Sequence, residues 1–236
     1  TFLISGLSLS LIRRADASPA VAVRTPMRDE IAEGLRALWH SPILRALAAS
    51  GASVQFFGGF LSALYAAYLI RTLHFSPFLM GVTIGAGGIG SVAGALLTGR
   101  LTRSLGYGRS ILMTRLLHDL FTFLIPLAGG PKALAFAMIV VAQAAGDPFW
   151  TSHDIATISL RQAIVPRRLL GRVGSAMHLL QAGMLPLGAI TAGLLADAIG
   201  VRETLFVAAT GMTLSIVWLL ASPIGALDAL PSGSSV

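Results

Sequence analysis

The sequence predicts an all-α integral membrane protein with six membrane-spanning helices, and three observations lead to this fold class. Hydrophobic residues make up 55% of the 236 residues and charged residues only 11%, which is more apolar surface than a soluble domain of this length buries. Six segments are apolar over the roughly 20 helical residues that a bilayer core requires. Most lysines and arginines lie between these segments. The lipid bilayer is therefore the expected surrounding of this chain.

The net charge of +7 does not indicate a nucleic-acid partner. The 17 lysines and arginines are spread between apolar runs and form no basic stripe interleaved with aromatic residues. The chain has no cysteine, which excludes disulfides, thiolate zinc sites, iron–sulfur ligation and cysteine nucleophiles. We expect no metal and no cofactor.

Residues 1–12 are expected to be the end of a membrane helix that begins upstream. They are apolar but stop at Arg13 and Arg14, after about half the length that a span requires. A secretory signal peptide would carry its positive charges before the apolar run, whereas here they follow it.

Residues 13–42 are expected to form a cytoplasmic linker that contains an amphipathic helix. Helical periodicity from Met27 to His40 places apolar residues on one face, and such a helix is expected to lie along the membrane surface. The apolar face comprises Ile31, Leu35, Leu38 and Trp39. An ordinary solvated connector remains the alternative.

Residues 43–221 are expected to form the six-helix transmembrane bundle, followed by a cytoplasmic tail at 222–236. Each span is closed by glycine or proline, which punctuate helices. The expected spans are Ile43 to Ile70, Phe78 to Gly99, Ser110 to Ala128, Ala133 to Leu160, Val173 to Ala196 and Thr204 to Ala221.

The arginines predict the orientation of the spans, because short cytoplasmic loops retain Lys and Arg. The segments before the first span, after the second and after the fourth together hold twelve basic residues, whereas the intervening loops hold three. The arginine-rich loops are therefore expected to face the cytoplasm.

One loop sequence is specific enough to suggest a family. The stretch from Gly99 through Arg103 and Gly106 to Arg109 resembles the loop motif G-x-x-x-D-R-x-G-x-R-R of the major facilitator superfamily. Arg103 stands where the family usually has aspartate, so the resemblance does not extend to the charge relay that this aspartate makes with neighbouring helix ends. The resemblance implies helices 7–12, the C-terminal six-helix bundle of a transporter whose N-terminal half is missing.

A second loop, which contains Arg161, Gly171 and Arg172, is similar to that of the enterobactin exporter-like branch of this family. That branch expels siderophores, macrolides and other amphiphilic compounds. The resemblance implies proton antiport with a small-molecule substrate in a bacterial cytoplasmic membrane.

Small residues suit helices that must slide closely past one another during alternating access. The second span carries the glycine pairs Gly81/Gly85 and Gly90/Gly94 at four-residue spacing. Its G-x-G-x-x-G pattern does not favour a dinucleotide site, because no strand precedes it. In the fifth span, Pro186 is either a gate hinge or a packing feature.

The energy source is expected to be an ion gradient. A P-loop requires lysine followed by serine or threonine, and the only lysine, Lys132, is followed by Ala133.

Acidic residues inside a span are costly and indicate function. Asp147 and Asp154 share one face of the fourth span with Gln143 and Trp150, and this face is expected to line a substrate and proton pathway. Asp147 is the candidate for binding a cationic substrate or exchanging a proton. Two structural alternatives stay open: Asp147 caps a break before Pro148, and Asp154 pairs with a loop arginine such as Arg161.

Other polar residues complete the candidate site. Gln55 and Tyr65 of the first span, with Gln181 of the fifth, would suit a broad amphiphile pocket or would simply pack. Asp119 follows Arg115 by four residues, a spacing that predicts an ion pair along one helix. The histidines of the spans, His118, His153 and His178, are proton-coupling candidates or packing residues.

Secondary active efflux is the favoured function, and the chain is not expected to be an enzyme. A membrane scaffold or sensor is one alternative. An intramembrane aspartyl protease is another, because Gly146 and Asp147 partly match the G-x-G-D form of such proteases.

Overall fold

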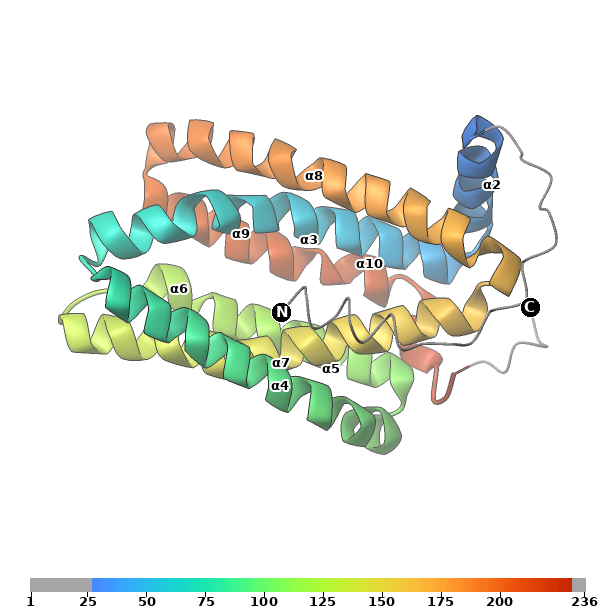
Figure 1. The fold of residues 1–236 in the computed structure, drawn as a ribbon, viewed down its shortest axis with the longest axis horizontal. Coiled ribbons are helices and arrows are strands. Elements are labelled where there is room, and N and C mark those ends of the chain that lie inside the picture. The colour runs from blue at the N-terminus through green and yellow to red at the C-terminus, as the bar shows by residue number, and fades with distance from the viewer. Residues whose placement is uncertain (1–26, 231–236) are drawn as a thin grey trace, which may run out of the picture.

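The computed structural model describes residues 27–230, and this part of the chain is helical without any strand (Figure 1). Six of its helices are long and apolar enough to cross a membrane, so the predicted fold class is confirmed. Residues 1–12 and 13–26, assigned from sequence to a truncated helix and a linker, lie outside the described residues, as do 231–236.

The helices follow one another with short connections. In chain order they are α2 (Met27–His40), α3 (Pro42–Ala67), the π-helical turn η1 (Tyr68–Thr72), α4 (Pro77–Leu105), α5 (Tyr107–Thr122), α6 (Leu124–Leu127), α7 (Lys132–Ile164), the 3₁₀ turn η2 (Arg167–Leu169), α8 (Leu170–Ile199), α9 (Val201–Leu214), α10 (Ile216–Leu220) and the 3₁₀ turn η3 (Pro223–Ala226).

Local sequence explains where the spans begin and turn. Ser41 and Ser76 cap α3 and α4 through their side chains, and each is followed by proline at the first helical position, where proline loses no helical hydrogen bond. Gly106 and Gly200 connect successive helices at φ angles of 80° and 101°, which favour glycine.

The bundle has two layers (Figure 1). One layer contains α3, α8, α9 and α10, and the other contains α4, α5, α6 and α7. The closest packing within the layers joins α3 to α8 and α7 to both α4 and α5. Two apolar cores fill the ends of the bundle, one around Leu160 and Val173 and the other around Phe60 and Leu205. The polar groups described below lie between these cores.

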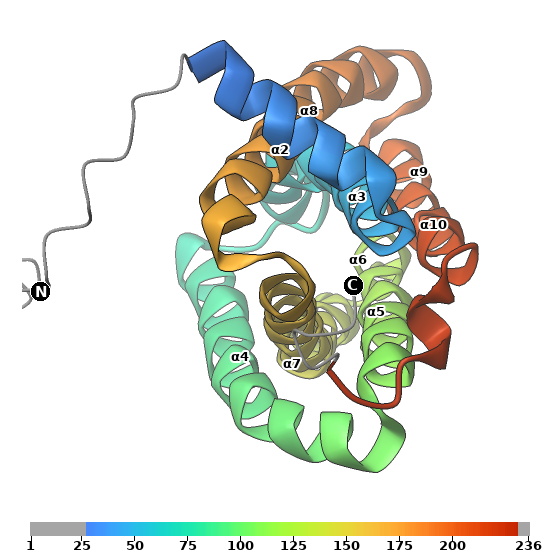
Figure 2. The same ribbon diagram turned by 90° about the vertical axis from the view of Figure 1, so that its right-hand side faces the viewer.

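Helix α2 lies across one end of the bundle and packs mainly against α8 (Figures 1 and 2). Leu38 is buried in the core, whereas Leu35 and Trp39 are exposed. A Cβ on Gly34 would overlap the carbonyl group of Arg172, and Glu33 forms an ion pair with Arg172. The helix is therefore fixed to the beginning of α8 by packing and by charge.

Candidate functional site

The polar face of α7 opens into two separate cavities. Asp147 and Gln143 line the first, which has a volume of about 420 Å³ and is called here the Asp147 cavity. Trp150 and Asp154 line the second, of about 240 Å³, called the Asp154 cavity. The one face predicted from the sequence therefore serves two compartments.

The Asp147 cavity contains an acid that has no partner in the described part of the chain. Tyr65 of α3 lies opposite α7, and its hydroxyl accepts a hydrogen bond from Gln143 Nε2 at 3.1 Å. His118 of α5 also lines this cavity. Within the described residues, Asp147 makes neither a hydrogen bond nor an ion pair, and its carboxylate is only partly buried. This carboxylate is consequently available to a cationic ligand or a proton.

Close packing of α4 against α7 sets the position of Asp147. A Cβ on Gly87 would overlap the Asp147 carboxylate, and one on Gly90 or Gly94 would meet the backbone of α7 at Ala144 or Pro148. Gly90 and Gly94 therefore lie where the two helix backbones approach closely, as expected of small residues. Gly81 and Gly85 instead meet no atom of the described chain within 4 Å, because they point away from α7.

Helix α7 continues without interruption from Lys132 to Ile164, with Pro148 in its interior. The alternative that Asp147 caps a break before Pro148 is therefore wrong. Pro148 lies where α4 packs on α7: a Cβ on Gly94 would overlap the Pro148 backbone, and Ser152 Oγ donates to the carbonyl of Gly94 at 2.9 Å.

The Asp154 cavity brings together amides from two other helices. Gln55 of α3 and Gln181 of α8 line it with Trp150 and Asp154, so these four predicted residues share one compartment. Gln181 packs directly on Gly51, where a Cβ would overlap its amide.

Arg161 also lines the Asp154 cavity, but within the described residues no ion pair joins it to Asp154. Its guanidinium instead lies 3.9 Å from the sulfur of Met177. The alternative in which Asp154 pairs with Arg161 is therefore not observed in the described chain, and Asp154 is exposed.

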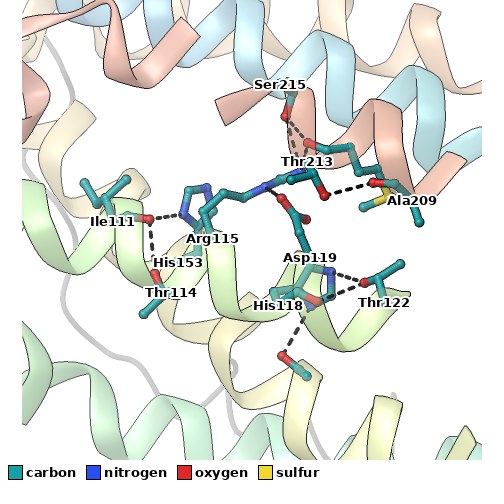
Figure 3. A network of polar contacts seen from close by, with 12 residues as sticks. Ile111, Thr114, Arg115, His118, Asp119, Thr122, His153, Ala209, Thr213 and Ser215 are labelled. Atoms are coloured by element: carbon teal, nitrogen blue, oxygen red, sulfur yellow. Dashed lines mark hydrogen bonds and ion pairs between the residues drawn. The ribbon is translucent and has the colours of Figure 1, made fainter. Parts of the chain in front are cut away.

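A buried ion pair joins Arg115 and Asp119 of α5 (Figure 3), and Arg115 also lines the Asp154 cavity. Arg115 Nε donates to Asp119 Oδ2 at 2.8 Å, and the two side chains are 1% and 0% exposed. The pair predicted from the four-residue spacing is confirmed. Arg115 Nη2 also donates to the carbonyl of Met212 at 2.9 Å and to Ser215 Oγ at 3.2 Å.

The contact with Met212 exists because the last span is interrupted. Helix α9 ends at Leu214, α10 begins at Ile216, and Ser215 Oγ donates to the Met212 carbonyl at 2.6 Å. Arg115 binds this same carbonyl across a sequence separation of 97 residues. Sequence reasoning missed the contact; its only signals were an arginine in an apolar span and a serine in the last one.

Two of the three histidines of the spans flank this pair. A ring nitrogen of His118 lies 3.2 Å from the carbonyl oxygen of Gly146, and one of His153 lies 3.0 Å from that of Ile111 (Figure 3). The centroid of the Trp150 ring lies 5.1 Å from that of His118 and 6.3 Å from that of His153. His178 is exposed and does not belong to this cluster.

The loop-motif residues are distributed along the end of the bundle that carries α2. Gly106 makes the α4–α5 turn, and the C-terminal segment docks there, since Gly108 N donates to the carbonyl of Leu227 at 2.8 Å. Arg103 and Arg109 are exposed beside this turn, as are Gly99 at the end of α4 and Gly171 at the start of α8. The sequence did not predict that residues 227 and 228 pack on the turn.

Pro186 lies inside α8, which continues through it. Beside it, a Cβ on Gly188 would overlap the backbone of Phe56, and one on Gly59 would overlap the carbonyl of Leu185. Pro186 therefore lies beside a close contact between α3 and α8.

The two cavity acids belong to the same helix and line different compartments. An aspartyl protease requires two carboxylates that face one another across a shared water, an arrangement that Asp147 and Asp154 do not form.

The family model described as Major Facilitator Superfamily matches residues 1–189, most of the chain. No curated protein matches the chain.

Proposed function

We propose that this chain, which belongs to the Major Facilitator Superfamily of membrane transporters, exports small amphiphilic compounds by proton antiport. The observation that carries the proposal is Asp147, a carboxylate inside a membrane span that lines a cavity of about 420 Å³ without an ion-pair partner in the described chain. An intramembrane acid of this kind is costly unless it is used.

Antiport follows if a proton and the substrate compete for Asp147. A carboxylate neutralises its charge either by taking a proton or by binding a cationic group. Each state excludes the other, so proton entry from one side of the membrane would release the substrate there. Tyr65 and Gln143 supply a polar rim, and the remaining walls are largely apolar, a lining that suits amphiphiles such as drugs, macrolides or siderophores.

Alternating access requires helices that tilt without exposing backbone groups. Glycines supply the contacts of α4 with α7 and of α3 with α8, and small residues let backbones approach closely enough to slide. We infer that the helices move relative to one another at the α4–α7 and α3–α8 contacts. Pro186 of α8 lies at the α3–α8 contact.

A second six-helix bundle is part of the proposal. The spans formed by α4, α7 and α8 are the least buried of the six described spans, and all three contribute residues to the walls of the polar cavities. A preceding N-terminal half would cover them and supply the other wall of the pathway.

We further propose that the protein lies in a bacterial cytoplasmic membrane with the α2 end facing the cytoplasm. The α4–α5 and α7–α8 connections lie at that end with α2 (Figure 1), and they carry most of the loop arginines.

The test is transport driven by a proton gradient. The complete transporter is reconstituted in vesicles with a fluorescent lipophilic cation, and an imposed pH gradient is expected to drive its transport. Asp147→Asn, which keeps the shape but loses the exchangeable proton, is expected to abolish the response to the gradient. Asp197→Asn is the matched control, because Asp197 is exposed at the end of α8 and lines neither cavity.

Two results would overturn the proposal. Unchanged gradient-driven transport in Asp147→Asn would remove Asp147 from coupling. Absence of any flux in the wild type across lipophilic cations, macrolides and siderophores would favour a non-transporting role.

A further inference from the structure

A large apolar groove lies on the side of α3 opposite the polar cavities. Its volume is about 550 Å³, and α2, α3, α8 and α10 form its walls. Ser50 and Val54 of α3 face the Asp154 cavity, whereas Ala48, Ala49 and Ala52 line this groove. Because residues about half a turn apart point in opposite directions from a helix, the groove opens away from the proposed substrate pathway.

The mouth of the groove has the composition of a membrane interface. Trp39 and Trp218 line it and are 70% and 51% exposed. Trp218 Nε1 donates to Ser53 Oγ at 3.2 Å, which holds the indole at the edge of α3. Tryptophans concentrate where lipid headgroups meet acyl chains. Figure 2 shows α2 crossing α8 and α3 at this end of the bundle, with α10 beside them.

Arg45 places a positive charge at the mouth of the groove. Arg45 lines the groove, is exposed, and its guanidinium carbon lies 6.0 Å from the centroid of the Trp39 ring. It forms no ion pair within the described residues, and no carboxylate lines the groove. The mouth is therefore electrostatically complementary to an anion at the level of the headgroups.

We infer that this groove binds one anionic membrane phospholipid, with its phosphate beside Arg45 and an acyl chain along the alanines of α3. The alanine floor leaves a narrow apolar channel that a flexible hydrocarbon chain fills without displacing side chains. An exported compound would instead traverse the cavities on the other face of α3. This site is independent of the proposed export activity.

The experiment measures lipid retention by the purified complete protein. Detergent-solubilised protein is titrated with phosphatidylglycerol or with phosphatidylcholine, and bound lipid is counted by native mass spectrometry. One phosphatidylglycerol is expected to bind more tightly than phosphatidylcholine. Arg45→Gln is expected to weaken phosphatidylglycerol binding about fivefold and to leave phosphatidylcholine binding unchanged, whereas Arg45→Lys retains the preference.

A second variant tests the groove itself. Ala49→Leu fills the floor without changing charge and is expected to lower retention of both lipids. Two matched controls should bind lipid as the wild type does. Arg168→Gln removes an exposed charge outside the groove, and Ala63→Leu enlarges an exposed α3 residue that does not line it.

Three outcomes would overturn the inference. Equal loss of both lipids in Arg45→Gln would show that the headgroup charge is not recognised. Unchanged lipid retention in both Arg45→Gln and Ala49→Leu would place the lipid elsewhere. Displacement of phosphatidylglycerol by dimer formation would assign the groove to a second copy of the chain. Size-exclusion profiles like that of the wild type confirm that each variant is folded.

Discussion

The bundle contains two carboxylates, Asp119 and Asp147, whose surroundings differ: Asp119 is buried and paired with Arg115, whereas Asp147 faces a cavity. Asp119 is fully buried, and its Oδ2 accepts a hydrogen bond from Arg115 at 2.8 Å. Arg115 in turn binds the interrupted last span at Met212 and Ser215. Asp147 faces a cavity and has no ion-pair partner in the described chain.

This difference separates a structural charge from an available one. A buried pair recovers its desolvation cost only through its partner and through further hydrogen bonds, so neither side chain can change partner freely. An unpaired acid in a cavity can exchange a proton or a ligand. The two regions should therefore respond to mutation in opposite ways, the first in stability and the second in transport.

The largest expected effect is the loss of stability in Arg115→Met. Asp119 would remain buried without its counterion, and removing one partner of a buried pair costs about 3–5 kcal/mol. The thermal unfolding midpoint in detergent should fall strongly. The double variant Arg115→Met/Asp119→Leu should recover much of the loss, whereas a stable single variant would contradict the structural role of the pair.

Asp154→Asn is the next largest expected effect and concerns transport. The cavity it lines also contains Arg161 and two glutamines, so removing the only acid among the described lining residues should weaken binding of a cationic substrate about tenfold, or 1.4 kcal/mol. KM is the quantity to measure, with the unfolding midpoint as control. An unchanged KM together with a lower midpoint would make Asp154 structural.

Ser215→Ala should have a smaller effect, confined to stability. It removes the hydroxyl that accepts from Arg115 at 3.2 Å and donates to Met212 at 2.6 Å, and a buried hydrogen bond contributes about 1 kcal/mol. Transport per folded molecule should stay constant. A change in the pH profile of transport, with the midpoint unaffected, would contradict the assignment.

Tyr65→Phe should have the smallest effect. Its hydroxyl accepts one hydrogen bond from Gln143 at 3.1 Å in a partly exposed cavity, so the cost in stability should be about 0.5 kcal/mol. A modest rise in KM for the transported compound is expected. Loss of folding would show that Tyr65 belongs to the core and not to the cavity rim.

Periodicity in α7 predicted that Gln143, Asp147, Trp150 and Asp154 share a face, and all four do line cavities. The division of that face between two compartments was not predictable, because it depends on helices that approach α7 from distant parts of the sequence. The four-residue spacing predicted the Arg115–Asp119 pair because both residues lie on one turn of the same helix. It could not predict the contact of Arg115 with Met212, which lies 97 residues away in the sequence.

The sequence by itself determined the number of spans and the ends at which arginine gathers, since hydropathy and charge act residue by residue against the bilayer. It also determined the ion pair within one turn of a helix. Only the tertiary structure decided which glycines of α4 meet α7, that Arg115 reaches the break in the last span, and that α3 has a polar cavity on one side and an apolar groove on the other. These contacts depend on how helices rotate and approach one another, and packing sets that geometry over the whole bundle.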